Sequence, residues 1–335
     1  MSKRTTTALT SAALLATTGL AAAPAVAADL TIYTYSSFVS EWGPGPAIEG
    51  GFEQRCGCDI EFVSADDGVA ILSRLRLEGA SSPADVVLGL DTNLIAEAVA
   101  EGVVVPHGLD TGGYDLPVAW TDPHFVPFDW GYFAFVYDTQ AIAEPPGSLR
   151  ALVEDSEAEI LIQDPRTSTP GLGLLLWMRA VFGDEAEAMW AELAPRIVTV
   201  TSGWSEAYGL FLEGEAPMVL SYTTSPAYHR IAEDTDRYEA AVFEEGHYLQ
   251  IEVAGIAATA DDVDLAREFL AYLTGPEAQS AIPTTNWMYP VVMPEGGLPD
   301  GFDAPPETPS LLMEPETVRD NRGIWVDEWL SALSR

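Results

Sequence analysis

The spacing of hydrophobic and polar positions changes repeatedly along the chain and predicts alternating strands and helices. Residues 29–35 alternate apolar and polar side chains, as a strand with one buried face does. Residues 69–78 place apolar side chains at helical spacing, and residues 86–90 form a short apolar run that predicts a buried strand. This alternation is typical of an α/β layer with a mostly parallel sheet.

The same alternation continues through the rest of the chain. The further expected strands are residues 59–63, 128–138, 160–163, 198–201, 218–222 and 247–257. The further expected helices are a short one ending near Arg55, one capped by Asp91 and running to Glu101, and residues 148–154, 171–182, 185–193, 205–213, 265–274, 276–281 and 315–334. The buried face of the last helix is expected to consist of Val318, Ile324, Trp325 and Leu330.

Two extended apolar segments, near 124–138 and 246–258, separate the α/β units and predict two lobes joined by more than one crossing. We expect the first lobe to comprise residues 29–127 with about 251–290, and the second to comprise 128–250 with about 291–335. Ligands of open α/β sheets bind beyond the carboxyl ends of the strands, so the cleft between the lobes is the expected binding site.

The first residues predict a secretory signal peptide over 1–28. Lys3 and Arg4 give a charged start, an apolar stretch follows, and Ala25-Val26-Ala27 forms a small-residue cleavage site. A membrane anchor is disfavoured because the segment is short and rich in Thr and Ala. The mature protein is therefore expected to be exported to the periplasm.

The net charge of the chain disfavours some classes of binding partner. The 335-residue chain has a formal net charge of −37, which argues against nucleic acids and anionic membranes as partners. A surface this acidic is typical of a salt-loving organism, and salt would screen any long-range attraction of a cationic ligand. The hydrophobic content of 47% leaves enough apolar residues for an ordinary core.

The two cysteines, Cys56 and Cys58, leave two alternatives open. An oxidising compartment permits a disulfide, but so small a loop contributes at most about 2 kcal/mol; free thiols are the other alternative. No metal site is expected, because two thiols are too few ligands. The histidines also lack metal-ligand spacing; they are His107, His124, His229 and His247.

Residues 199–229 carry the clearest indication of a binding site. Trp204, Tyr222 and Tyr228 stand among Gly, Ser, Thr and Pro instead of in apolar runs. Aromatic side chains in such a context are more often presented at a cleft than packed in a core. Rings with polar tips suit a flat, partly polar ligand, and they also suit a cation.

Several longer motifs extend this indication over most of the chain, from about residue 30 to the C-terminus. They are YTYSSF…EWGPGP, DDGVAILSRLRLEG, ADVVLGLD, FVPFDWGYFAFVYD, QDPRTSTPGLGLLLWM, GWSEAYGLFLEGE, LSYTTSPAYH, EGHYLQ and AIPTTNWMYPV. In this order they resemble the periplasmic thiamine-binding proteins of bacterial ABC importers. The acidic surface and Trp130, where that family more often has Tyr, are the departures.

The resemblance implies a two-lobed type 2 periplasmic-binding fold that closes on thiamine, thiamine monophosphate or thiamine diphosphate. It also implies a membrane permease with its ATPase as partners, no cofactor, and a monomer. The family's ligand residues fall here on Tyr35, Asp67, Gly68, Ser168, Trp204, Tyr222, Tyr228 and Trp287.

The chemistry of these residues fits that ligand, although each also has a structural explanation. Asp67 can accept from the aminopyrimidine or balance the thiazolium charge, or it can simply cap a helix. Ser168 precedes a Pro- and Gly-containing helix start, which suits a phosphate or an ordinary cap. Gly68 allows close backbone approach or satisfies a turn. Tyr35 can pack within a strand, and Trp287 can anchor a surface.

Within the set, Trp204 is expected to border the arm that carries phosphate. Tyr222 and Tyr228 are expected to border the pyrimidine. A permanently cationic ring next to such side chains gains affinity from their π-faces.

Two alternatives share the implied fold. Ferric-binding proteins use clustered tyrosines, but Tyr222 and Tyr228 are separated by TTSPA and no adjacent tyrosine pair accompanies them. Thiaminases of type I use a cysteine nucleophile, and Cys56 and Cys58 lie in no recognisable activated setting. The motif GWSEA at 203–207 lacks the final Gly of a nucleophile elbow. No enzymatic activity is therefore expected.

Overall fold

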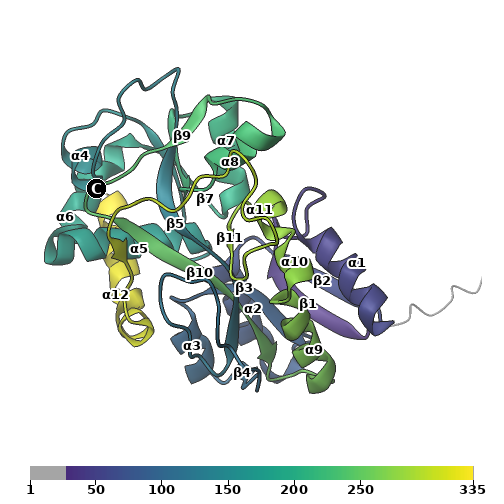
Figure 1. Ribbon diagram of the computed structural model, residues 1–335. Helices are drawn as coiled ribbons and strands as arrows, with labels where there is room; N and C mark the ends of the chain where they lie inside the picture. Colours follow the sequence, from purple (N-terminus) through teal and green to yellow (C-terminus); the bar gives the residue numbers. More distant parts are fainter. Residues whose placement is uncertain (1–27, 335) are drawn as a thin grey trace, which may run out of the picture.

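One continuous sheet organises the protein (Figure 1). The computed structural model describes residues 28–334, so all but the last residue of the expected signal peptide lies outside the described residues. The strands of the main path, in spatial order, are β2 (Ile60–Ala65), β1 (Leu30–Tyr35), β3 (Val86–Asp91), β10 (His247–Ala257), β5 (Phe125–Asp138), β8 (Met218–Tyr222), β6 (Ile160–Gln163) and β7 (Ile197–Thr201). Strands β2, β1 and β3 pair in parallel, as do β8, β6 and β7.

The two long strands β5 and β10 join the two parallel groups. The first part of β5 pairs with β10 in an antiparallel register from Phe125 to Tyr132, and its second part pairs with β8 from Phe133 to Tyr137. Both strands are buried along nearly their whole length. The expected crossings near 124–138 and 246–258 are confirmed as these two strands, while the exact lobe boundaries stay a prediction.

Helices cover the sheet on both sides of these crossing strands (Figure 1). They are α1 (Gly45–Cys56), α2 (Gly68–Glu78), α3 (Ile95–Ala100), α4 (Leu149–Glu154), α5 (Thr169–Phe182), α6 (Ala186–Leu193), α7 (Trp204–Glu213), α8 (Pro226–Ala232), α9 (Val263–Leu273), α10 (Pro276–Gln279), α11 (Ile282–Thr285) and α12 (Pro315–Leu333). Short strands β4 (Val104–Val105), β9 (Tyr238–Ala240), β11 (Tyr289–Pro290) and β12 (Ser310–Leu311) pair at the sides of β5 and β10.

Local sequence explains where the helices nearest the cleft begin. Asp67 precedes α2 in an extended conformation, and its side chain accepts from the Gly68 N–H. Ser168 caps α5 in the same way, with Pro170 in the first turn, where the missing N–H costs nothing. Helix α5 is buried over most of its length because it lies at the centre of the second half.

Three predictions about individual elements were wrong. Helix α3 begins at Ile95 and not directly after Asp91, because the Asp91 carboxylate accepts from Asn93 in a turn. In α12 the expected burial of Val318 is confirmed, and Trp325 and Leu330 pack partly buried against the core. Ile324, however, is 60% exposed, and Trp329, which was not expected in the buried face, is buried against α6. Helices α8 and α11 were not expected, because 7 and 4 residues are too few to show a helical period.

The structure decides between the two alternatives for the cysteines. Cys56, the last residue of α1, forms a disulfide with Cys58. Over residues 28–334, none of the helices combines the length and the apolar character that spanning a membrane requires.

Candidate ligand-binding site

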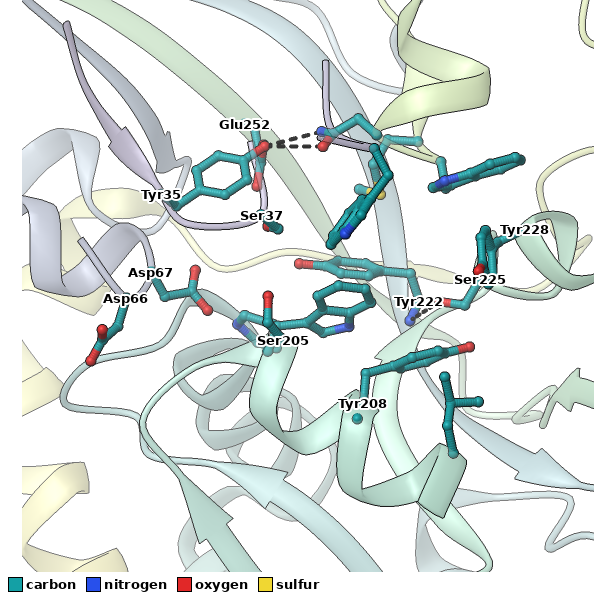
Figure 2. Close-up of a pocket in the computed structure, with 18 residues that line it drawn as sticks. Tyr35, Ser37, Asp66, Asp67, Ser205, Tyr208, Tyr222, Ser225, Tyr228 and Glu252 are labelled. Carbon is teal, nitrogen blue, oxygen red and sulfur yellow. Dashed lines mark hydrogen bonds between the residues drawn. The ribbon is translucent and has the colours of Figure 1, made fainter. Parts of the chain in front are cut away.

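A cavity of about 320 Å³ opens between the two halves of the molecule, at the lower end of the size range of small-molecule sites. Figure 2 shows side chains from both halves converging on it. Its lining consists of Tyr35, Ser37, Trp42, Asp66, Asp67, Pro170, Trp204, Ser205, Tyr208, Gly209, Leu212, Tyr222, Ser225, Tyr228, Glu252, Asn286, Trp287 and Met288. Tyr35 and Tyr222 end β1 and β8, so the cavity lies at carboxyl ends of strands, as expected for this fold class.

Most of the predicted site residues come together in this cavity. Those that line it are Tyr35, Asp67, Trp204, Tyr222, Tyr228 and Trp287. Gly68 and Ser168 do not line it, and they lie directly behind Asp67. Whether these residues bind the ligand stays a prediction, which the following sections develop.

Four rings from the second half form one side of the cavity, which we call the aromatic wall: Trp204, Tyr208, Tyr222 and Tyr228. Trp204 stacks on Tyr208 with ring centroids 4.9 Å apart, and its Nε1–H donates to Ser221 Oγ at 2.8 Å. Figure 2 shows these tyrosines arriving from several elements, with Tyr222 extending into the middle of the pocket. The wall is therefore rigid and presents ring faces and hydroxyl groups together.

A buried network holds the wall from behind. The Tyr208 hydroxyl hydrogen-bonds to His229 Nε2 at 2.9 Å, and His229 Nδ1 contacts Glu233 at 2.7 Å. Tyr228 donates to the other oxygen of Glu233 at 3.0 Å. Burial lowers the pKa of His229, which favours the neutral imidazole. This histidine supports ring positions and does not itself line the cavity.

Two tryptophans approach the wall across the cleft. Trp287 meets Tyr228 edge-on at 5.4 Å, and Trp42 meets Trp204 at 6.4 Å. Trp287 has a φ of 56°, in the left-handed region that a bulky residue rarely adopts. Such strain costs about 1–3 kcal/mol and gathers at functional sites. The strained backbone of Trp287 therefore indicates that the placement of its side chain in the cavity is worth a loss of stability.

Asp67 joins the two halves behind the cavity. Its Oδ2 accepts from the Ser168 hydroxyl at 2.8 Å and its Oδ1 from the Gly68 N–H at 2.8 Å. Burial raises the pKa of Asp67, while these donors act against that rise. Asp67 is thus a helix cap and a lining residue at once, so the two explanations offered for it are compatible.

Gly68 has a packing role at this point. A Cβ there would lie 2.3 Å from the Gly89 carbonyl oxygen and 2.4 Å from Thr169 Oγ1. A glycine is therefore needed for α2 to approach β3 and the start of α5. Ser168 is fully buried, where it caps α5 and donates to Asp67.

Two buried carboxyl groups, Asp129 and Glu252, lie opposite each other on β5 and β10, and we call them the acidic floor. Glu252 lines the cavity and accepts from the Tyr35 hydroxyl at 2.7 Å, as Figure 2 also shows by their proximity. Asp129 accepts from the side-chain amide of Asn286, which also donates to the Tyr35 hydroxyl at 3.0 Å.

Burial dominates the electrostatics of this floor. It raises the pKa of Asp129 to about 8. Burial, and then the charge of Asp129, raises the pKa of Glu252 well above its usual value. Over residues 28–334, neither carboxyl forms an ion pair with an arginine or histidine. A cation entering the cavity would supply the positive charge that the floor lacks.

Sequence reasoning did not find the floor or part of the wall. The lining residues it missed are Ser37, Trp42, Asp66, Pro170, Ser205, Tyr208, Gly209, Leu212, Ser225, Glu252, Asn286 and Met288, and it also missed Asp129 behind the lining. A signal for the floor does exist, because Asp129 and Glu252 are single charges inside the apolar strands FVPFDWGYFAFVYD and HYLQIEVAGIA. A buried charge usually needs a partner or a function.

In the part of the chain that the structure describes, no three His, Cys, Asp or Glu side chains come together as a metal-binding group. The chemistry of the cavity, with several ring faces, hydroxyl groups and unpaired carboxyls, suits an organic cation instead.

Comparisons with known proteins place the chain in a family. Residues 27–280 match the model of the bacterial extracellular solute-binding proteins. The thiamine-binding periplasmic protein of Brucella abortus is 55% identical over 96% of this chain and 97% of its own length. The protein of the same name from Escherichia coli is 52% identical over 91% of this chain and 94% of its own length.

Solved structures agree with this placement. A periplasmic thiamin binding protein superposes with a TM-score of 0.88 at 52% identity, covering 91% of this chain and 96% of its own. A ferric binding protein from Campylobacter jejuni superposes with a TM-score of 0.75 at 18% identity, over 90% of this chain and 99% of its own, which shows a shared fold alone. The chain belongs to the bacterial extracellular solute-binding proteins, with the two-lobed type 2 periplasmic-binding fold.

Proposed function

We propose that this protein captures thiamine in the periplasm and delivers it to the membrane permease and ATPase of an ABC importer. The observation that carries the proposal is the meeting of an aromatic wall and an uncompensated acidic floor in one cavity. Relatives at 52–55% identity, which align over more than nine-tenths of this chain, are named for the same ligand.

The charge and shape of thiamine fit that cavity. Its thiazolium ring is permanently cationic, and a cation over Trp or Tyr gains about 0.5–2 kcal/mol. Micromolar binding needs about 8 kcal/mol, so a single ring is not enough. Several rings of the wall, with Glu252 facing them, reach this range together. The aminopyrimidine ring borders Tyr222 and Tyr228, and the hydroxyethyl arm borders Trp204.

The arm determines which forms of the vitamin bind. Beyond Trp204 lie Asp67 and the first turn of α5, which begins at Thr169. A helix start favours a phosphate, but the Asp67 carboxylate already accepts from Ser168 there. In our proposal thiamine monophosphate and diphosphate bind as well, because the helix start outweighs the opposing charge of Asp67.

Capture depends on closure between the halves. The contacts that join them around the cavity are the Ala70 N–H to Thr167 carbonyl bond of 3.0 Å, the Ser168–Asp67 bond and the Tyr228–Trp287 ring contact. In our proposal these contacts form when a ligand is bound and break when the lobes rotate about β5 and β10. The protein acts as a monomer in this cycle.

A binding role also agrees with the cysteine chemistry. The relatives are named as binding proteins. Cys56 and Cys58 are joined in a disulfide and do not line the cavity, so they offer no thiolate nucleophile there. We therefore propose binding without catalysis, which intact thiamine after incubation with the protein and a nucleophile would support.

Calorimetric titration with thiamine, at low and at high salt, tests the function directly. We expect micromolar or tighter binding, accompanied by quenching of tryptophan fluorescence and a higher melting temperature. Trp325→Phe in α12 is a matched control, because this tryptophan lies outside the cavity and the substitution should leave binding unchanged. Absence of binding heat with thiamine and both phosphate esters would exclude the proposal.

The ester preference has its own test. Asp67→Asn removes the negative charge near the arm, and Ser168 can still donate to the amide oxygen. We expect the affinity ratio of thiamine diphosphate to thiamine to rise at least about fivefold in this variant, since one less like charge faces the phosphates. An unchanged ratio would show that the phosphates bind elsewhere.

A further inference from the structure

The acidic floor has a chemical consequence beyond binding a cation. Two carboxyl groups buried side by side cannot both ionise at low cost, because each charge is desolvated and repels the other. The antiparallel register places Asp129 directly opposite Glu252, and both side chains are buried. The pair therefore retains a proton at a pH where ordinary carboxyls have lost theirs.

The surroundings of the pair supply hydrogen bonds but little positive charge. Tyr35 from β1 donates to Glu252 Oε2, and Gln250 from β10 donates to its Oε1 at 2.9 Å. Asn286 donates to one oxygen of Asp129, while the other, Oδ1, is buried without a partner. An unpartnered oxygen at this depth is available to hold or share the proton.

Over residues 28–334, the titratable groups that the neighbouring elements place beside the pair are neutral or acidic. From the neighbouring elements these groups are Tyr35 of β1, Asp67 at the start of α2, Asp91 of β3 and Tyr222 of β8. Burial raises the pKa of Tyr35 and of Tyr222, so both hydroxyls stay protonated. Arg322 acts on Asp91 and not on the pair. A bound organic cation would be the first positive charge beside the floor.

We propose that binding of cationic thiamine expels the proton that Asp129 and Glu252 otherwise share, so that capture is an exchange of a proton for an organic cation. The inference rests on the proposed function. In charge terms, the ligand brings +1, one proton leaves to the solvent, and the charge of the carboxyl pair becomes more negative by one. The floor then contributes to affinity only when pH permits this release.

The exchange sets a definite pH dependence. Where the unliganded pair holds the proton and the complex does not, affinity rises about tenfold for each pH unit. The rise in affinity ends near the pH where the unliganded pair loses its proton. Above that pH the pair has no proton left to release on binding. Burial raises the pKa of Asp129 to about 8 and that of Glu252 well above its usual value, so affinity should rise through the whole neutral range.

Calorimetry with unphosphorylated thiamine in two buffers of different ionisation heat measures the released protons at each pH. Thiamine without phosphate is needed because a phosphate ester titrates near pH 6 itself. Between about pH 6.5 and 8, we expect release approaching one proton and an affinity that rises with pH. The double variant Asp129→Asn, Glu252→Gln should release none and should match the wild type only at acid pH.

Asp91→Asn provides the matched control. Asp91 lies opposite Glu252 on β3 and is equally buried, but it does not line the cavity. This variant should release protons as the wild type does. Melting curves, together with the single variant Glu252→Gln, establish whether the double variant is folded.

The outcomes separate the two proposals. Thiamine binding with equal heats in both buffers, release that persists in the folded double variant, or release lost in Asp91→Asn would each overturn the proton exchange while the proposed function stands. A lack of binding at every pH would instead overturn the proposed function.

Discussion

The aromatic wall and the acidic floor line the same cavity, but the chain builds them differently. The four rings of the wall come from one continuous stretch, 204–228. The polar groups of three of them, Trp204, Tyr208 and Tyr228, are anchored by Ser221, His229 and Glu233. The two carboxyls of the floor are 123 positions apart in sequence and lack a counter-charge.

The difference indicates that the aromatic wall and the acidic floor have different roles in binding. Anchored rings lose little side-chain freedom when a ligand binds, so they supply affinity. An uncompensated carboxyl pair destabilises the unliganded protein and is relieved by a cation, so it supplies selection for charge. The following changes test these roles, from the largest expected effect to the smallest.

The largest effect concerns the floor and the stability of the unliganded protein. A carboxyl whose folded pKa is raised binds more protons in the folded state, so its contribution to stability falls as pH rises from the unfolded pKa, about 3.9, to the folded one. For Asp129 the folded pKa is about 8. Between pH 5 and 8 the cost is about 1.4 kcal/mol per pH unit, and Asp129→Asn should remove it.

Melting temperatures of wild type and variant across that pH range measure this effect. The variant should melt higher than the wild type at pH 8, with the gap narrowing toward pH 5. Because both proteins share the acidic surface, the difference isolates Asp129. A constant gap would show that Asp129 carries no raised pKa.

Loss of the central ring of the wall comes next. Trp204→Ala removes a ring face, its stacking on Tyr208 and the bond to Ser221. We expect thiamine affinity to fall at least about thirtyfold, equivalent to about 2 kcal/mol. Trp204→Phe keeps a ring face and should lose less, as titration calorimetry can show. Equal losses in both variants would assign the effect to the indole N–H.

Loss of the Tyr228 ring should reduce thiamine affinity less than loss of Trp204. Loss of the Tyr228 hydroxyl alone should reduce it least. Tyr228→Ala removes the ring that meets Trp287 and should weaken binding about five- to tenfold. Tyr228→Phe removes only the bond to Glu233, and we expect less than about a threefold change. Tyr114→Ala, at a half-buried tyrosine outside the cavity, is the control for general destabilisation.

The smallest expected effect is a gain in stability at Trp287. Trp287→Asn places a residue that tolerates the left-handed region where φ is 56°. Relief of strain should raise the unfolding free energy by up to about 1 kcal/mol, while ligand affinity falls because a ring is lost. Chemical denaturation and calorimetry measure the two quantities separately. A loss of both would mean that Trp287 packing outweighs the strain.

A structural feature could be predicted from the sequence when neighbouring residues alone determine it. Strands such as β8 and β10, at 218–222 and 247–257, were predicted at their observed bounds because they consist mostly of apolar residues. The wall residues Trp204, Tyr222 and Tyr228 were found because their turn-rich context is visible within a few positions. The burial of Trp329 in α12 was missed because it depends on packing against α6, which no local period reveals.

The sequence by itself determined the α/β alternation, the crossing strands, the family resemblance and several of the aromatic residues that line the cavity. Only the tertiary structure decided that Asp129 and Glu252 lie opposite each other beneath those rings. The physical reason is that ring context and strand periodicity are local properties of the chain. The pairing of two distant strands, and the loss of solvent that raises the pKa values of their carboxyls, arise only when the sheet has formed.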